Sequence, residues 1–368
     1  MRILLVVALL FAPLFTQAQT LVQDTVTIEL ARVTAVANER IENIPGTQTP
    51  AKTQTLTAII LTGIESEKNI TFENDFPTQL SIGDKFYVRH ATNSFDETDT
   101  YAVSAPYRLP ALLLLAVAFL AILFIFGGIQ GIRGLAALAG SIVLIFFVLV
   151  PGILQGYSPT LVATGIAGII IILGSYITHG FNKTTTAAVF GMLGTVALTG
   201  LAAYWAVHAA NLSGFAAEES MYLNFDTNGG IDLVGLLFGG IMIGLLGILY
   251  DIAIGQAVAV EELFHAGAHL SRKEVYQRAI RIGREHIGAL VNTLAIAYVG
   301  ASLPLLLLIQ SSTYGVAYML NSEIFATEIV RILIGSIGLV VAVPVTTLIA
   351  SRMLSSETSR THTSHHHH

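Results

Sequence analysis

Residues 244–308 decide the fold, and they read GLLGILYDIAIGQAVAVEELFHAGAH (244–269), SRKEVYQRAIRIGREH (271–286) and IGALVNTLAIAYVGASLPLLLL (287–308). The first and last segments are apolar over enough residues to cross about 30 Å of hydrocarbon. The segment between them carries five basic side chains. We therefore expect two membrane helices that are joined by a basic loop.

Charged and amide side chains of the C-terminal two-thirds of the chain are concentrated in this stretch. They include Asp251, Gln256, Glu261, Glu262, His265, Glu285, His286 and Asn292. On a helix Asp251 and Glu262 share a face, Gln256 lies off that face, and Glu285 and Asn292 share a face of the next helix. If the two helices form an antiparallel hairpin, the two polar faces can meet at its cytoplasmic end.

Polar groups are costly in hydrocarbon, so their concentration calls for a reason, and three interpretations remain open. The first is an ion or solute path along the two helices, with the candidate residues Asp251, Gln256, Glu262, Glu285 and Asn292. The second is a divalent-cation site with the ligands His265 and His286, and otherwise no cofactor is expected. The third is a structural charge network in which the acidic side chains pair with Arg281 and Arg284.

The composition of the whole chain is that of a polytopic α-helical membrane protein. Apolar residues make up 54% of the 368 residues and charged residues 11%, whereas about 25% of a typical soluble domain is charged. The absence of cysteine excludes disulfides and thiolate metal sites. Residues 353–368 are a tail that ends in a tag-like histidine run.

The N-terminal 108 residues are expected to be exported. Residues 1–18 have the basic start and short apolar run of a secretory signal peptide, with an uncleaved anchor as the alternative. Residues 19–108 alternate in β-forming side chains between turn residues, which predicts a small all-β barrel or sandwich of oligonucleotide-binding-fold shape. Its acidic balance argues against nucleic acid. We expect it to pack or to dock a partner, with a ligand role as the alternative.

Residues 109–352 are expected to form a domain of seven transmembrane helices. The apolar spans cover about 110–127, 134–152, 160–178, 185–207, 231–258, 286–309 and 328–350. Basic residues gather in alternate loops, which places those loops and the C-terminus in the cytoplasm and the β-domain outside. This agrees with the orientation that an exported N-terminal domain requires.

Three details of the spans carry their own expectations. Arg331 lies just inside the last span, and we expect it to pair with Glu328 on the same helical face. Pro304 and Pro344 lie inside the last two spans, where each can kink its helix. Glycines at spacings of three and four are expected to let helices approach closely.

Three segments resemble the YibE/F-like family of bacterial membrane proteins: GLLGILYDIAIGQAVAVEEL, RAIRIGREHIGALVNTLAIAYVGASLPLLLL and EIVRILIGSIGLVVAVPVTT. The resemblance covers the whole membrane region and implies an integral protein of the bacterial cytoplasmic membrane, for which a permease is one role considered. Family members carry two consecutive acidic residues where this chain has Tyr250 and Asp251. This departure argues against a two-acid ion site there.

The sequence favours a transporter or channel for an ion or small solute, with a pathway along the fifth and sixth spans. The alternative is a membrane scaffold that docks an envelope protein through the exported β-domain. A homo-oligomer is a further possible assembly in the lipid bilayer. An enzyme is not expected, because no nucleophile, nucleotide or phosphate-binding motif is present.

Overall fold

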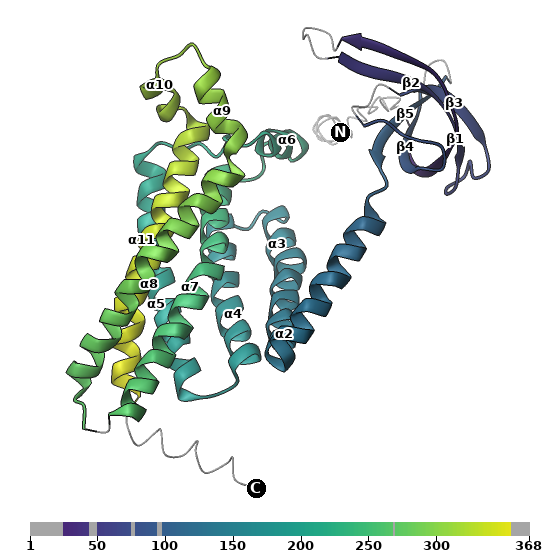
Figure 1. Ribbon diagram of the computed structural model, residues 1–368. Coiled ribbons are helices and arrows are strands. Elements are labelled where there is room, and N and C mark those ends of the chain that lie inside the picture. The colour runs from purple at the N-terminus through teal and green to yellow at the C-terminus, as the bar shows by residue number, and fades with distance from the viewer. Residues whose placement is uncertain (1–24, 44–49, 75–77, 94–97, 268, 355–368) are drawn as a thin grey trace, which may run out of the picture. The chain divides into compact units, whose positions relative to one another are not determined.

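The computed structural model describes residues 25–43, 50–74, 78–93, 98–267 and 269–354. The chain divides into two compact units between Ala121 and Ile122. The expected signal peptide and the histidine run lie outside the described residues. Figure 1 labels the helices and strands of both units.

The first unit contains one five-stranded antiparallel sheet that curls into a half-barrel (Figure 1). Its strands, in the spatial order β3-β2-β1-β4-β5, are β1 (Thr25–Asn43), β2 (Pro50–Ile60), β3 (Asn69–Asn74), β4 (Lys85–Thr92) and β5 (Asp99–Pro106). The first half of β1 pairs with β4 and the second half with β2, so this one strand spans the curl. Alternate side chains such as Val33, Leu56 and Phe86 fill its concave core. The expected all-β domain is therefore confirmed as a half-barrel.

Five helical segments among the described residues are long and apolar enough to cross a membrane. They are Leu109–Leu154, which comprises α2 (Leu109–Leu144), a π-helical turn η1 (Ile145–Leu149) and α3 (Val150–Leu154), and then α4 (Pro159–His179), α5 (Lys183–Ala209), α7 (Leu233–Ala266) and α11 (Glu323–Met353). A sixth crossing results if α8 (Arg272–Ala301) and α9 (Leu303–Ser311) count as one broken span. Two short helices, α6 (Glu218–Asp226) and α10 (Val316–Asn321), lie between the long ones.

Two breaks interrupt the long apolar helices, the first between the expected spans 110–127 and 134–152 and the second inside the expected span 286–309. The helix through the first two spans breaks at Gly128, whose φ of 53° and ψ of −142° no other residue type adopts easily. The expected span 286–309 bends by 66° between α8 and α9. Pro304 at the start of α9 explains this bend, because it has no N–H to continue the helical ladder. By contrast, α11 continues as one helix through Pro344.

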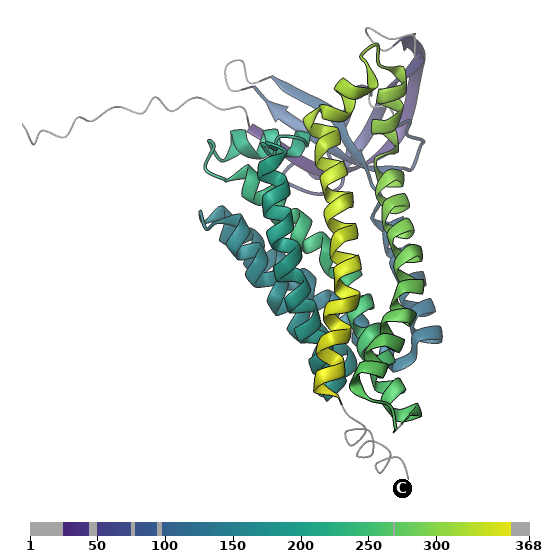
Figure 2. The ribbon, with the colours of Figure 1, turned by 90° about the vertical axis from the view of Figure 1, so that its left-hand side faces the viewer.

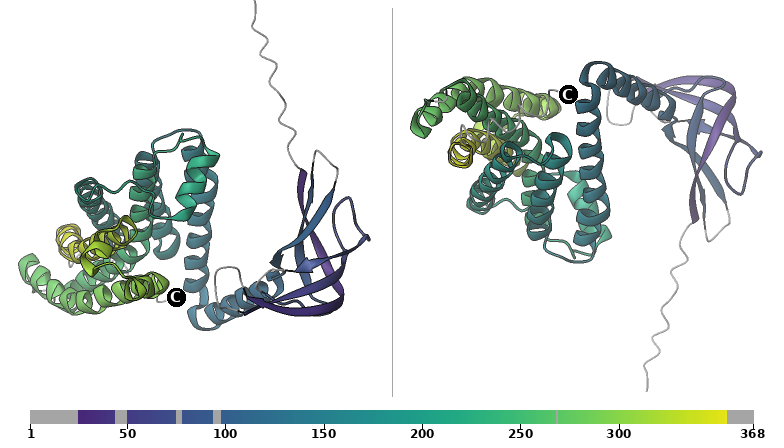
Figure 3. Two further views of the ribbon diagram at one scale, coloured as in Figure 1. Left: turned by 90° about the horizontal axis from the view of Figure 1, so that it is seen from above. Right: turned by 90° about the horizontal axis from the view of Figure 1, so that it is seen from below.

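The second unit is a helix bundle in which α11 lies beside α5, α7 and α8 (Figure 2). The same helices are seen end-on in Figure 3. Small residues bring them close: a Cβ on Gly191 of α5 would lie 2.5 Å from Thr346 Oγ1 of α11. Likewise, a Cβ on Gly239 of α7 would lie 3.0 Å from the Cβ of Ala163 on α4. Close approach at small residues thus replaces the hydrophobic effect as the source of helix contact in a membrane.

Candidate functional site

A cavity of about 410 Å³ lies at the break that separates α8 from α9. We call it the break cavity. Its walls come from four segments: residues 214–220, 233–240, 301–305 and 324–331. Breaking the helix leaves backbone groups without an intrahelical partner at a cavity wall, which is where membrane proteins tolerate irregular backbone.

Charged side chains of α11 line one wall of the break cavity. Arg331 Nη1 donates to Glu328 Oε1 at 2.6 Å, which confirms the expected pairing. Both side chains remain partly exposed, at 31% for Arg331 and 23% for Glu328. Beside them, the Oγ1 of Thr327 is buried and has no hydrogen-bond partner among the described residues. This wall therefore offers a cation, an anion and an unused hydroxyl.

The N-terminal turn of α11 is anchored to the loop that follows α5. Glu323 accepts hydrogen bonds from the backbone N–H of Ser213, at 2.8 Å, and from its hydroxyl, at 2.7 Å. At Gly214, the next residue, a Cβ would lie 2.4 Å from the carbonyl oxygen of Leu233. These contacts hold the loop against the start of α7 and shape the cavity wall.

The same face of α11 becomes apolar one turn further along the helix. A Cβ on Gly335 would lie 3.0 Å from Leu294 of α8 and 3.7 Å from Leu245 of α7. Both leucines are buried. Three helices therefore meet in an apolar contact that follows the charged wall.

A buried polar pair joins α7 to α11 near the other end of the bundle. Thr347 Oγ1 donates to Gln256 Oε1 at 2.9 Å, and Gln256 is only 4% exposed. A Cβ on Gly283 of α8 would lie 2.6 Å from the Gln256 amide nitrogen and 2.4 Å from Val343. Gln256, which lies off the face of Asp251 and Glu262, thus contacts both α8 and α11.

The remaining candidate residues are not brought together. All six lie on exposed positions: Asp251, Glu262, His265, Glu285, His286 and Asn292. Within the described part of the chain, Glu262 and His265 are the two of these that come within ion-pair distance, at 4.0 Å, as neighbours on one helix. His286 Nδ1 lies 3.2 Å from the carbonyl of Ile282 in its own helix. The proposed path and cation ligands therefore stay predictions.

Among the described residues, no hydrogen bond or ion pair joins the polar faces of α7 and α8. Asp251 and Asn292 lie on exposed positions, and α7 approaches α8 at Gln256 and Gly283. Within the described ranges no ion pair joins Glu261 or Glu262 to Arg281 or Arg284. Periodicity gave the spacing on each helix correctly but could not give the rotation of one helix against the next.

Sequence reasoning also missed the break cavity as a site. Its signals were present: Arg331 and Glu328 within an apolar span, and Pro304 within the preceding one. Pro304 and Arg331 are distant in sequence, and the fold places both on the same cavity.

Comparison with protein families identifies the membrane region. A model of the family described as YibE/F-like protein matches residues 115–356, well over half of the chain. The chain belongs to the YibE/F-like family. The matched residues of this YibE/F-like protein include the break cavity and the Gln256–Thr347 pair. Comparisons with curated proteins and with solved structures give no match.

Proposed function

We propose that this YibE/F-like protein is a transporter or channel of the bacterial cytoplasmic membrane that moves an ion or a small polar solute. The observation that carries the proposal is the break cavity, which combines a broken helix with the Glu328–Arg331 pair. Binding sites of membrane transporters typically lie at discontinuous helices, where freed backbone groups and a few charged side chains contact the solute.

The order of side chains along α11 supports a path that is closed between two polar regions. Arg331 lines the break cavity. Further along the helix, Gly335 packs against Leu245 and Leu294. Still further, Thr347 donates a hydrogen bond to Gln256. Arg331 and Thr347 are separated by about 24 Å along the helix axis, at a rise of 1.5 Å per residue. In this proposal the leucine contact is the barrier that must open for a solute to pass between the polar regions.

We also propose seven crossings, with the half-barrel outside the membrane after a secretory signal peptide and the C-terminus in the cytoplasm. The segment Leu109–Leu154 has 46 residues. It is therefore about 69 Å long as a helix, more than twice the thickness of the hydrocarbon. The break at Gly128 divides it into two lengths that can each cross. The bent pair α8–α9 and the other four helices supply the remaining five crossings.

The test is flux through purified protein in liposomes, measured separately for K⁺, Cl⁻ and small organic anions and zwitterions. Arg331→Gln and Glu328→Gln should each abolish the flux that the wild-type protein supports. The matched control is Arg352→Gln, which alters an exposed arginine at the other end of α11 and should leave flux intact. If folded wild-type protein moves none of these solutes, the result favours the alternative of a scaffold that docks an envelope partner.

A further inference from the structure

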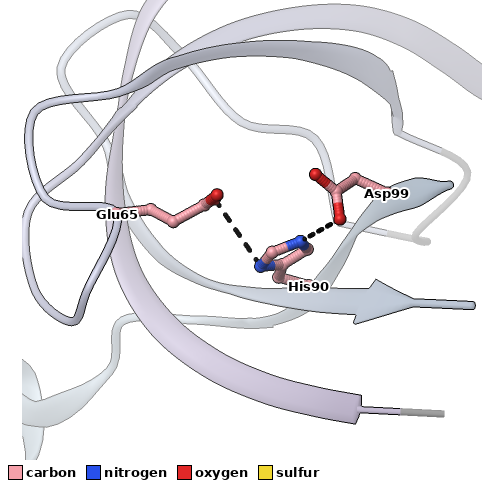
Figure 4. A group of neighbouring side chains, drawn as sticks. All are labelled: Glu65, His90 and Asp99. Atoms are coloured by element: carbon pink, nitrogen blue, oxygen red, sulfur yellow. Dashed lines mark hydrogen bonds and ion pairs between the residues drawn. The ribbon is translucent and has the colours of Figure 1, made fainter. Parts of the chain in front are cut away.

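Three side chains of the half-barrel converge from separate segments of the chain (Figure 4). Glu65 lies in the turn between β2 and β3, His90 lies in β4, and Asp99 opens β5. One ligand-type atom from each residue lies within 4.8 Å of the others. The imidazole stands between the two carboxylates: Nε2 is 2.9 Å from Asp99 Oδ1, and Nδ1 is 3.6 Å from Glu65 Oε2.

Each of the three side chains is held in place by a neighbour. The hydroxyl of Tyr101 donates to Glu65 Oε2 at 2.9 Å, and the hydroxyl of Thr92 donates to Asp99 Oδ1 at 2.8 Å. The ring of Tyr101 also stacks on the imidazole of His90, with centroids 4.6 Å apart. Hydrogen-bonded carboxylates and a fixed imidazole are the outer-shell arrangement that orients metal ligands in proteins.

A lysine ammonium already stabilises the negative charge of this cluster. Lys68 Nζ lies 2.7 Å from Glu65 Oε1 and 3.8 Å from Asp99 Oδ2. The hydrogen bond from Lys68 is the main reason that the pKa of Glu65 lies below its usual value. The side chain of Lys68 is 43% exposed, so it can swing into water without leaving a buried charge.

We propose that Glu65, His90 and Asp99 bind a divalent transition-metal ion of the Zn²⁺ type, and that Lys68 takes the place of the ion in the metal-free protein. One imidazole nitrogen with two carboxylates is a ligand set that suits such ions, whereas Mg²⁺ and Ca²⁺ prefer oxygen ligands alone. Zn²⁺ holds its ligands at about 2.0–2.2 Å, which places them about 3.4 Å apart in a tetrahedral site. The imidazole nitrogens now face different carboxylates, so binding of one ion requires one carboxylate to move to the nitrogen that faces the other.

The position of the cluster gives the ion a structural role. In the order β3-β2-β1-β4-β5, the strands β3 and β5 are the two edges of the sheet. Glu65 precedes β3 and Asp99 begins β5, so an ion bound to both would link the two edges of the half-barrel. Metal binding is thereby coupled to the stability of this fold.

Titration of the full-length purified protein with Zn²⁺ tests the proposal. The histidines at 362 and 365–368 are first replaced by serine, because the histidine run would bind Zn²⁺ itself. Calorimetry should then show one Zn²⁺ per chain and no binding of Mg²⁺. His90→Asn should weaken binding by at least about 100-fold, and Tyr101→Phe and Thr92→Val should each weaken it by about 10- to 100-fold.

Lys68→Met distinguishes a metal site from a simple ion-pair cluster. Removing the competing ammonium should tighten Zn²⁺ binding by about fivefold or more. The repulsion between two unit positive charges about 4 Å apart weakens binding by at least that factor even in water. His208→Asn and His269→Asn, which alter exposed histidines outside the half-barrel, are the matched controls and should change nothing. Unchanged or weaker binding in Lys68→Met would overturn the proposal, as would full binding in His90→Asn. Lys68→Met tests whether the cluster binds Zn²⁺ even if His90→Asn fails to fold.

Discussion

At Gly283 of α8, side chains of α7 and α11 fill the space that a side chain would take. The missing side chain leaves room for Val343 and for the Gln256 amide, which a Cβ would meet at 2.4 Å and 2.6 Å. Gln256 cannot move away freely because it accepts a hydrogen bond from Thr347. Forcing extra atoms into such a contact typically costs about 1–3 kcal/mol.

We therefore predict that Gly283→Ala lowers the melting temperature of the protein purified in detergent, despite the gain of about 1 kcal/mol in helix propensity. The matched control is Gly288→Ala in the same helix, where a Cβ would meet nothing within 4 Å. That variant should melt at the same temperature as the wild type or higher. Equal melting of the two variants would show that the three helices are not packed as described.

Residues differ in how far the sequence can predict their environment. Glu328 and Arg331 were paired correctly because both partners lie on one helix, where spacing alone sets the distance. Asn292 lies on an exposed position of α8. Its environment depends on how α8 is rotated against its neighbours, and that rotation is set by contacts such as Gly283 with Val343, which are distant in sequence.

At the scale of elements, the β4–β5 hairpin depends on ionised carboxylates. The hydrogen bond from His90, followed by that from Thr92, lowers the pKa of Asp99 below its usual 3.8. The hydrogen bond from Lys68 lowers the pKa of Glu65 below its usual 4.5. A carboxyl group whose pKa is lower in the folded state adds stability above its usual pKa, and this stability is lost as the pH falls through the lowered value.

We therefore predict that amide protection of β4 and β5 is constant from pH 7 to about pH 5 and falls below pH 4.5. The measurement is hydrogen exchange of the full chain in EDTA, corrected for the intrinsic pH dependence of exchange. Asp99→Asn should be less protected at pH 7 and should lose less protection on acidification. An identical pH profile in the variant and the wild type would contradict this account of the hairpin.

The elements themselves were predictable where one physical signal dominates. Apolar length alone located α4, α5, α7 and α11. The breaks were predictable only in part: the apolar pattern ends one span next to Gly128, and a kink was expected both at Pro304, where the helix bends, and at Pro344, where α11 continues. Whether such a residue breaks a helix depends on what the neighbouring helices can accept, which local sequence does not contain.

At the scale of the whole molecule, the proposed topology follows from charge and length. The first unit holds polar strands, whereas the second holds apolar helices with basic residues concentrated at the start of α8. Five crossings before α8 place that basic segment in the cytoplasm if the half-barrel is outside. Counting the segment Leu109–Leu154 as one crossing would reverse the side of every later loop.

The accessibility of single introduced cysteines reports this topology directly, because the chain has no cysteine of its own. We predict that Ser81→Cys in the half-barrel and Gln155→Cys after α3 both react with an impermeant maleimide on intact cells. Labelling of both would mean that Leu109–Leu154 crosses twice. Lys273→Cys, which spares the Ser271 cap of α8, should react only after the membrane is permeabilised. Labelling of Ser81→Cys but protection of Gln155→Cys would leave a single crossing there, and the barrier proposed on α11 would then need the opposite orientation.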